Sequence, residues 1–412
     1  MSVSTTSIAT GASRPAISLR ALSVPPSPIR KLVGFADEAR NRGIKVYNLN
    51  IGQPDIPTPP QFFEVLRSFD EKVLSYGHSK GHVNLLKAWS GYYMQRGLDV
   101  RPEQIQITTG GSEAILFALL LTCDAGDNIV MSEPFYTNYY SLAKAAAVEV
   151  RPFAAEPSLG YCLPAREVIE KAINDRTRAI LICSPNNPTG TVLTRDEIAL
   201  IVQIADEHNL FILSDEVYRE FCYGQSHVSI WQYPQAAHRA ILLDSISKRF
   251  SACGARVGAL VSRNEAIMDG ALRLGQARLC TATVEQLAAV HLMDLDDEYY
   301  AGIAREYQSR RDLVIARLKQ MPGVHCETPA GAFYLMAGLP IDDADRFCQW
   351  MLTDFNHNGE SVMLAPGAGF YATPGRGKRE VRIAYVLENP ALDKAMDALA
   401  SGLKAYSILN RG

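Results

Sequence analysis

Residues 244–258 read DSISKRFSACGARVG, a stretch rich in small and hydroxyl residues. Lys248 stands among small and hydroxyl residues, and Arg256 follows eight positions later with no acidic residue between them. The preceding run, AILLDSIS (residues 240–247), is apolar enough to form a buried strand. A lysine at the end of such a strand is rare unless it is solvated or used. Loss of water and a neighbouring cation both favour a lowered pKa of its amine, which makes the amine a nucleophile.

Short apolar runs with the composition of strands lie on both sides of this stretch, mostly separated by segments of helical pattern such as TRDEIALIVQIADEHN. The runs cover residues 104–108, 128–134, 179–183, 210–217, 240–247 and 255–261. Continuous apolar strands that alternate with helices are typical of a mainly parallel sheet buried on both faces. In such sheets the sites lie at the carboxyl ends of the strands, which is where Lys248 stands.

The composition of the sequence changes near residue 296. A long charged stretch of helical pattern, DEYYAGIAREYQSRRDLVIARLKQM, begins there and leads into GAFYLMAGLP and REVRIAYV. A chain of 412 residues is also too long for one ordinary domain. We therefore predict an α/β chain with a second, smaller lobe that begins near residue 296.

The composition excludes several classes of partner. A net charge of −3 gives no attraction to nucleic acid or to an anionic membrane, and no apolar run is long enough to span a bilayer. The eight cysteines stand singly, so neither a zinc site nor a disulfide framework is expected. Dispersed cysteines fit a reducing compartment, and we expect a cytoplasmic protein.

The N-terminal arm has a composition of its own. The first 36 residues contain no acidic residue, are rich in serine and threonine, and include Arg14, Arg20 and Arg30. This composition has some of the character of an organellar targeting segment. A flexible arm explains it better, because chain termini are often poorly tied down.

A glycine pair follows the first strand. Gly110 and Gly111 precede Ser112 and a helical pattern. Glycines let the backbone approach a ligand closely, and the free N–H groups at a helix start favour an anion such as phosphate. An ordinary loop with a serine N-cap accounts for the same residues, so this stretch alone leaves both readings open.

Two further strand ends carry polar side chains. AILIC is followed by SPNNPTG, a stiff turn in which Asn187 either supports the turn or offers its amide to a ligand oxygen. LFIL is followed by SDEVY, in which Asp215 and Glu216 form an acidic pair. No histidine is nearby in sequence to complete a metal site, so no metal is expected. Asp215 can instead hold a proton on a ring nitrogen.

One cofactor requires all of these groups together. A phosphate needs a glycine–serine helix start, a hydroxyl such as that of Ser245 and an arginine such as Arg256. A pyridine nitrogen needs a carboxylate such as Asp215, and an aldehyde needs an amine such as that of Lys248. The sequence therefore predicts pyridoxal phosphate (PLP), held as a Schiff base by Lys248. No acid is needed between Lys248 and Arg256, because both serve the cofactor.

With these residues in place, the chain resembles the class I, fold type I aminotransferases of the aspartate aminotransferase family over residues 27–405. The resemblance rests on motifs in the family's order: NIGQPDIPTP, YGHSKG, TTGGSEA, EPFYTNY, SPNNPTG, SDEVY, SISKRFSACGARVG and VRIAY. It implies an N-terminal arm (residues 1–30) and a large PLP-binding domain (61–295) with a mainly parallel seven-stranded sheet flanked by helices. It also implies a smaller α+β domain (31–60 and 296–412). It also implies transfer of the amino group of an L-amino acid to a 2-oxo acid, 2-oxoglutarate, by a ping-pong aldimine and ketimine mechanism.

The resemblance assigns a role to each matching residue around the cofactor. Lys248, Asp215 and Tyr218 would be catalytic, with Asp215 on the pyridine nitrogen and Tyr218 on the ring 3′-oxygen. The other cofactor contacts would be Asn187 at the 3′-oxygen, Tyr136 stacked on the ring, and Gly111, Ser112, Ser245 and Arg256 at the phosphate. Tyr76 would reach the phosphate of the other subunit's site, so the resemblance also implies a homodimer with shared active sites.

Recognition of the substrate would rest on arginines. Arg382 would bind the α-carboxylate, helped by Asn187 and the backbone near Gly52. Relatives that prefer dicarboxylic amino acids use a further cation, which is either a lysine directly after the two glycines, where this chain has Ser112, or an arginine from the partner subunit. Arg278 in GQARLCTATVEQ stands in about the right place for the second arrangement.

That arrangement makes Arg278 our candidate for binding an acidic substrate at the mouth of the partner's site. Without such a role for Arg278, the region of Phe333 and Tyr334 is the next place to look. The motifs do not fix the preferred amino acid donor.

Two other functions use the same features. An enzyme of the same fold that catalyses β-elimination (of the C–S lyase type) or cyclisation would need the same lysine, so the motifs do not separate it from an aminotransferase. A non-catalytic regulator built on this fold would normally carry a basic helix-turn-helix extension, and the N-terminal arm is too short and too polar for one.

Overall fold

The computed structural model of the protein describes residues 16–409. Residues 1–15, which make up half of the predicted N-terminal arm, lie outside the described residues. The targeting character of their composition therefore stays an observation on the sequence alone. In the described part, no helix has both the length and the apolar character needed to cross a membrane.

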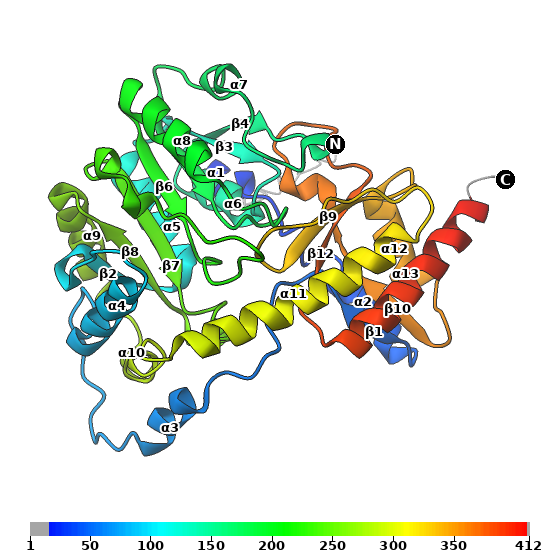
Figure 1. Ribbon diagram of the computed structural model, residues 1–412, viewed down its shortest axis with the longest axis horizontal. Helices are drawn as coiled ribbons and strands as arrows, with labels where there is room; N and C mark the ends of the chain where they lie inside the picture. The colour runs from blue at the N-terminus through cyan, green and yellow to red at the C-terminus, as the bar shows by residue number, and fades with distance from the viewer. Residues whose placement is uncertain (1–15, 410–412) are drawn as a thin grey trace, which may run out of the picture.

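A seven-stranded sheet forms the centre of the molecule (Figure 1). Its strands follow the order β2-β8-β7-β6-β5-β3-β4, and all of them run parallel except β8, which is antiparallel to both β7 and β2. The strands are β2 (Ile105–Thr109), β3 (Asn128–Glu133), β4 (Glu149–Ala154), β5 (Thr177–Cys183), β6 (Phe211–Asp215), β7 (Ala240–Ser245) and β8 (Val257–Ser262). The predicted mainly parallel seven-stranded sheet is thereby confirmed.

Both faces of this sheet are buried, which explains why its strands read as continuous apolar runs. Successive residues of β5 alternate between two hydrophobic clusters: Ala179, Leu181 and Cys183 belong to one, while Ile180 and Ile182 belong to the other. Helices α5 (Gly110–Thr122) and α6 (Thr137–Ala145) cover the first face. Helices α7 (Arg166–Glu170) and α8 (Arg195–Glu207) cover the second.

Two small sheets form the other part of the molecule, which lies beside the large sheet (Figure 1). β1 (Lys45–Asn48) pairs in parallel with β10 (Glu360–Met363). β12 (Glu380–Ala384) lies between β11 (Ala365–Pro366) and β9 (Tyr334–Gly338) in an antiparallel sheet. Helices α2 (Val33–Asn41), α12 (Ala344–Thr353) and α13 (Asn389–Leu409) pack against these strands. The domain limits at residues 31–60, 61–295 and 296–412 stay a prediction.

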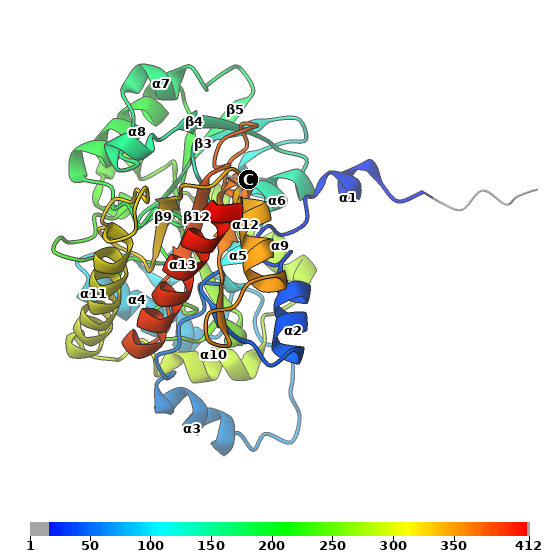
Figure 2. The same cartoon turned by 90° about the vertical axis from the view of Figure 1, so that its right-hand side faces the viewer.

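The charged stretch from residue 296 is a single helix, α11 (Asp297–Lys319), as predicted. The Asp296 side chain caps its first turn by accepting from the N–H of Tyr299, and the first turn is acidic while the last is basic. This distribution of charge suits the helix dipole. The helix runs from the region of α10 (Thr283–Val290) to the small sheets and so connects the two parts (Figures 1 and 2).

Other helices surround the first face or lie outside the body. α4 (Val83–Gln95) and α9 (Glu265–Arg278) pack near β2, and α1 (Leu19–Ser23) lies on the outside near α6. α3 (Pro60–Ser68) packs on α10, and the chain between α3 and α4 loops away from the body (Figures 1 and 2).

Candidate active site

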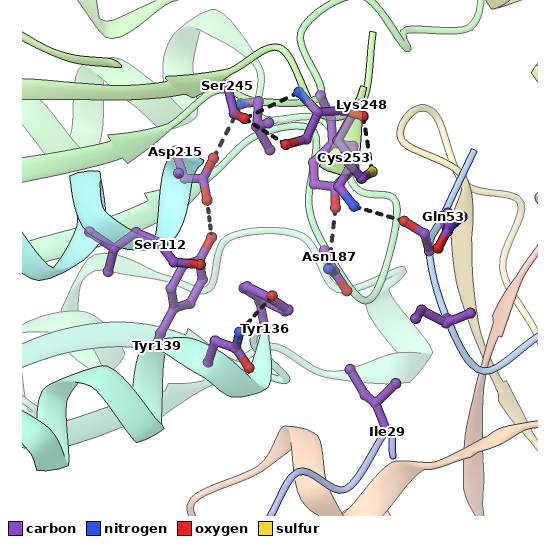
Figure 3. A pocket seen from close by; sticks show the side chains of 18 of the residues that line it. Ile29, Gln53, Ser112, Tyr136, Tyr139, Asn187, Asp215, Ser245, Lys248 and Cys253 are labelled. Atoms are coloured by element: carbon purple, nitrogen blue, oxygen red, sulfur yellow. Dashed lines mark hydrogen bonds between the residues drawn. The ribbon is translucent and has the colours of Figure 1, made fainter. Parts of the chain in front are cut away.

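A cavity of about 550 Å³ opens at the carboxyl ends of β5, β6 and β7, where the small sheets face the large one. Eleven of the residues predicted from the sequence line it: Gly52, Gly111, Ser112, Tyr136, Asn187, Asp215, Tyr218, Ser245, Lys248, Arg256 and Arg382. Figure 3 shows Ser245, Lys248 and Asp215 along one side of the cavity, Gln53 beside Lys248, and Ile29 at the opposite edge. The edge of the sheet therefore gathers residues that lie far apart in the sequence.

Lys248 stands in the turn directly after β7, and its Nζ donates to the carbonyl of Gly52 at 2.7 Å. Gly52 must be a glycine here, because a Cβ at this position would lie 1.6 Å from Oη of Tyr334. Burial lowers the pKa of the Lys248 amine, but Tyr334, Cys253 and Tyr136 raise it by more, so the net direction is upward. Burial and the nearby Arg382 act in the direction predicted from the sequence, and these three neighbours outweigh them.

Asp215 ends β6 with a buried carboxylate. Its Oδ2 accepts a hydrogen bond from the hydroxyl of Tyr139 at 2.6 Å, and its Oδ1 accepts from the backbone N–H of Val217 at 3.2 Å. Burial raises the pKa of Asp215 to about 6, although these two hydrogen bonds lower it. Because this carboxylate is buried, a positively charged group beside it would strongly stabilise its ionised form.

A chain of hydrogen bonds connects Arg382 with the strand ends of the large sheet. Arg382 on β12 is fully buried, and its Nη1 donates to Oδ1 of Asn187 at 2.9 Å while its Nη2 donates to the carbonyl of Asn50 at 2.5 Å. Nδ2 of Asn187 lies 3.4 Å from the hydroxyl of Tyr218, which is 3.0 Å from that of Tyr334. Arg382 thus presents a buried positive charge in the cavity.

The start of α5 and the chain before β8 form a cradle for an anion. Gly110 has φ +70°, and a Cβ there would lie 2.6 Å from Nη2 of Arg256. Arg256 itself has φ +53°, and Ser245 packs close to Gly111, whose added Cβ would lie 3.7 Å from that of Ser245. The free N–H groups of the helix start and the guanidinium converge, which is the arrangement that binds phosphate.

The ring of Tyr136 precedes α6 and stands edge-to-face with that of Tyr139, with the ring centroids 5.4 Å apart. The side chain of Asn138 donates to the hydroxyl of Tyr136 at 2.8 Å. These contacts fix the ring as part of the cavity wall opposite Lys248 and Ser245 (Figure 3).

Two predicted residues do not line this chain's cavity. Tyr76 lies between α3 and α4 with 81% of its side chain exposed. Arg278 ends α9, where its Nη2 donates to the carbonyl of Ile107 at 3.2 Å and its Nε lies 3.4 Å from the carboxylate of Glu113. The structure describes one subunit, so a role of either residue in a partner's site stays a prediction.

Several lining residues were not found from the sequence. Tyr139 is the most informative, since it is one helical turn from Tyr136 and bonds directly to Asp215; that spacing was a usable signal. Tyr334 enters the sequence-based prediction only as part of an alternative region for substrate recognition. The segment containing Ser27, Ile29 and Arg30 carried no motif, and it reaches the cavity through tertiary contacts such as the bond from Nδ2 of Asn50 to the carbonyl of Ile29 at 2.9 Å.

Comparison with known proteins gives consistent matches over nearly the whole chain. Residues 44–399 match the family described as "Aminotransferase class I and II". The chain is 30% identical to an aspartate aminotransferase from Thermotoga maritima (94% of this chain and 100% of that protein). It is 32% identical to aromatic-amino-acid aminotransferase 2 from Thermococcus litoralis (96% of this chain and 100% of that protein).

Solved structures match equally well. An aspartate aminotransferase from Thermus thermophilus with maleate superposes with a TM-score of 0.85 at 25% identity, and an alanine aminotransferase from Pyrococcus furiosus superposes with a TM-score of 0.85 at 28% identity. The two matches cover 94% and 95% of this chain and 100% of each solved chain. Proteins named for an acidic and for a small amino acid thus share this fold.

Proposed function

This chain belongs to the class I and II aminotransferases, and from that premise we propose that it transfers the amino group of an L-amino acid to 2-oxoglutarate at two sites shared within a homodimer. The enzyme has the fold type I architecture, and transamination with PLP is the activity of its family. The identities of the substrates, the roles of the individual residues and the assembly are the parts that we propose here.

The observation that carries the proposal is that one cavity contains the Lys248 amine, the buried Asp215 carboxylate and the anion cradle at Arg256. These groups fit the aldehyde, the ring nitrogen and the phosphate of PLP. Lys248 would hold the cofactor covalently, Asp215 would keep its ring nitrogen protonated, and Tyr218 and Asn187 would contact its 3′-oxygen. The phosphate would bind to Gly111, Ser112, Ser245 and Arg256, and the ring of Tyr136 would stack on the pyridine.

The bound cofactor supplies an electron sink for the substrate α-carbon. Arg382 offers two donors in a fork that matches the substrate α-carboxylate, so it orients the α-carbon toward Lys248. The amine of Lys248, once free, takes the proton from that carbon and later returns one as the acid. Positioned proton transfer of this type contributes about 10² to 10⁴ in rate. Tyr334 and Arg382 come from the small sheets, so this part of the molecule helps to exclude water.

Exposed apolar residues support the dimer. Phe63, Val73, Leu74 and Tyr76 lie on α3 or on the loop that follows it, with 41%, 73%, 62% and 81% of their side chains exposed. Apolar groups concentrated on a projecting segment are typical of an interaction surface. Covering this segment with a second subunit would also bring Tyr76 to a partner's phosphate site.

Two positive side chains support an acidic substrate. Nη1 of Arg278 is buried and makes no hydrogen bond within the described residues, so in the single subunit it is a donor that lacks an acceptor. Arg30 lines the cavity of its own subunit.

The cysteines support a cytoplasmic location. All eight are free, as is typical of proteins in a reducing compartment such as the cytoplasm.

The test is a half-reaction screen. Enzyme loaded with PLP is mixed with single L-amino acids in the absence of an acceptor, and the products are identified. We expect the matching 2-oxo acid and one equivalent of pyridoxamine phosphate per site, with the cofactor regenerated by 2-oxoglutarate. Release of ammonia and pyruvate without aminated cofactor would instead establish β-elimination.

Attachment of the cofactor has a separate check. Borohydride reduction followed by mass spectrometry should place the cofactor on the peptide containing Lys248 in the wild type and on no peptide in Lys248→Ala. A reduced adduct in Lys248→Ala would show that another lysine is the nucleophile.

A further inference from the structure

The residues on either side of the Lys248 turn form a buried ion pair that the reaction itself does not use. Asp244 precedes Ser245, and Arg249 follows Lys248. Both side chains are completely buried. They point toward α4, whereas the amine of Lys248 points into the cavity. Asp244 and Arg249 thus flank the segment that carries Ser245 and Lys248.

The pair is bidentate. Nη1 of Arg249 donates to Oδ1 of Asp244 at 2.7 Å, and Nη2 donates to Oδ2 at 3.1 Å. Burial raises the pKa of Asp244, but Arg249 and Arg219 lower it by more, so the net direction is downward and the pair is ionic. Fork-to-carboxylate pairing fixes both the distance and the relative orientation of two side chains.

Further contacts connect this pair to the surrounding structure. Oδ1 of Asp244 accepts the backbone N–H of Ser245 at 2.7 Å, while Oδ2 accepts from the hydroxyl of Tyr93 at 2.8 Å and from Nε1 of Trp89 at 3.2 Å. The guanidinium of Arg249 lies 4.5 Å from the ring centroid of Tyr92. The pair is therefore a brace between α4 and the two ends of the turn.

Stability alone does not account for this brace. A buried ion pair gives up so much hydration that well-packed apolar residues usually serve stability as well or better. What an apolar pair cannot supply is the fixed geometry across residues 244–249. The side chains of Ser245 and Lys248 rise from within that interval, so the brace determines how the backbone presents both of them.

We propose that Asp244 and Arg249 are positioning residues that hold the turn so that the Lys248 amine and the Ser245 hydroxyl meet their ligands in register. This proposal rests on the role proposed for Lys248. It predicts that removing the brace slows proton transfer more than it weakens substrate binding, even in a variant that has regained its stability.

The test compares Asp244→Asn, Arg249→Met and the double variant. Each single variant leaves one buried charge unpaired and should lower the Tm, whereas the double variant is neutral and should recover most of that loss. We expect the double variant nevertheless to keep a kcat at least tenfold below wild type, with KM for the amino acid changed less than threefold. A double variant that regains wild-type kcat together with its Tm would overturn the proposal, because the pair would then be purely structural.

A second measurement uses the cofactor-free protein, so it does not depend on the reaction or on its assignment. Backbone amides of residues 244–250 should exchange with deuterium at least tenfold faster in the double variant than in wild type. The control is Asp206→Asn/Arg239→Met, which removes an ion pair at the opposite end of β7 (Nη2 to Oδ1, 2.6 Å) and should leave both this exchange and kcat unchanged. Equal exchange in the double variant and in wild type would contradict the proposal.

Arg249→Lys keeps the charge balanced, so it tests the proposal even if the neutral variants do not fold. Lysine offers a point charge in place of a planar fork. We expect a folded enzyme with kcat lowered at least threefold and KM unchanged. A folded Arg249→Lys with wild-type kcat would show that the fork is not required.

Discussion

At the scale of single residues, Asp215 is held where an ionised carboxylate is poorly solvated. The pKa of Asp215 in the folded chain is about 6, above its ordinary 3.8. Folding of the cofactor-free protein therefore favours the protonated acid. The stabilising contribution is fully present below about pH 4 and is lost as the pH rises through 6, with a total change of about 3 kcal/mol.

Asp215→Asn should remove this dependence, since the amide resembles the protonated acid at every pH. Measured by urea unfolding of the cofactor-free proteins, the variant should match wild type near pH 4 and exceed its free energy of unfolding by about 3 kcal/mol near pH 7.5. The exposed Asp294→Asn is the control and should give the same small difference at both values. Parallel curves of unfolding free energy against pH for Asp215→Asn and wild type would contradict this account.

Asp215→Asn should also have a very low kcat, because a neutral amide cannot stabilise a protonated ring nitrogen.

Arg278 and Arg30 can be separated as determinants of an acidic substrate. Arg278→Ala should lower kcat/KM for glutamate by an amount that corresponds to roughly 1.5 to 3 kcal/mol, the value of a charge-assisted hydrogen bond. The kcat/KM for a neutral amino acid should stay nearly unchanged. Arg30→Ala is the matched comparison, because Arg30 lines the cavity of its own subunit. If only Arg30→Ala has the selective effect, the cation that binds the distal carboxylate comes from the N-terminal segment. If each variant affects both substrates equally, neither arginine is that cation.

The sequence could predict the residues whose chemistry is tied to a strand end. Lys248, Asp215 and Asn187 follow apolar runs directly, so topology alone brings them to one edge. Tyr139 and Tyr334 could not be chosen in this way, because an aromatic residue within an apolar segment is ordinarily part of the core. Their roles depend on which hydroxyl meets which partner, and that is fixed by tertiary packing.

At the scale of elements, β8 passes unusually close to the start of α5. A Cβ on Gly258 would lie 2.5 Å from the backbone carbon of Gly110 and 2.8 Å from the backbone nitrogen of Gly111. Gly258→Ala should therefore push the anion cradle out of place. We expect a loss of roughly 1–3 kcal/mol in stability from overpacking and at least tenfold weaker binding of PLP, measured by fluorescence titration.

Gly302→Ala provides the comparison within a helix. Nothing lies within 4 Å of a Cβ at this position of α11, so alanine should stabilise the protein by up to about 1 kcal/mol and leave cofactor affinity unchanged. Equal cofactor affinity in Gly258→Ala and wild type would show that the cradle tolerates the added methyl group.

The elements also show where sequence patterns reach their limit. Six apolar runs each gave a strand of the large sheet, with ends displaced by a few residues. β4 does not stand out as an apolar run, because EVRPFA contains two charged residues and Pro152. It lies at the edge of the sheet beside β3, where a strand has one neighbour and a proline is tolerated. Its membership depends on that neighbour and not on its own pattern.

At the level of the whole molecule, the proposed dimer makes a prediction that no single subunit can satisfy. Tyr76→Phe subunits and Lys248→Ala subunits should each be poorly active alone. In a mixed dimer, one site carries both lesions and the other carries neither. Refolding the two variants together should therefore restore activity to as much as half of the wild-type value per mixed dimer.

Sedimentation provides the control for this experiment. Wild type and both variants should sediment as dimers at the assay concentration. An active monomer whose activity does not change with concentration would contradict the shared site, as would mixtures that never exceed the activity of their components.

Helix α11 has a mechanical consequence. Near its beginning, the hydroxyl of Tyr299 donates to the carbonyl of Arg249 at 2.9 Å, next to Lys248 along the chain. Further along, Nη1 of Arg310 donates to Asp55 and to the carbonyl of Val386, each at 2.6 Å, close to the small sheets. An α-helix is stiff along its axis, so a displacement at one of these contacts is transmitted to the other. Any movement of the small sheets relative to the large sheet must therefore tilt the helix or break these hydrogen bonds. The helix in this way couples the width of the cavity to the backbone next to Lys248.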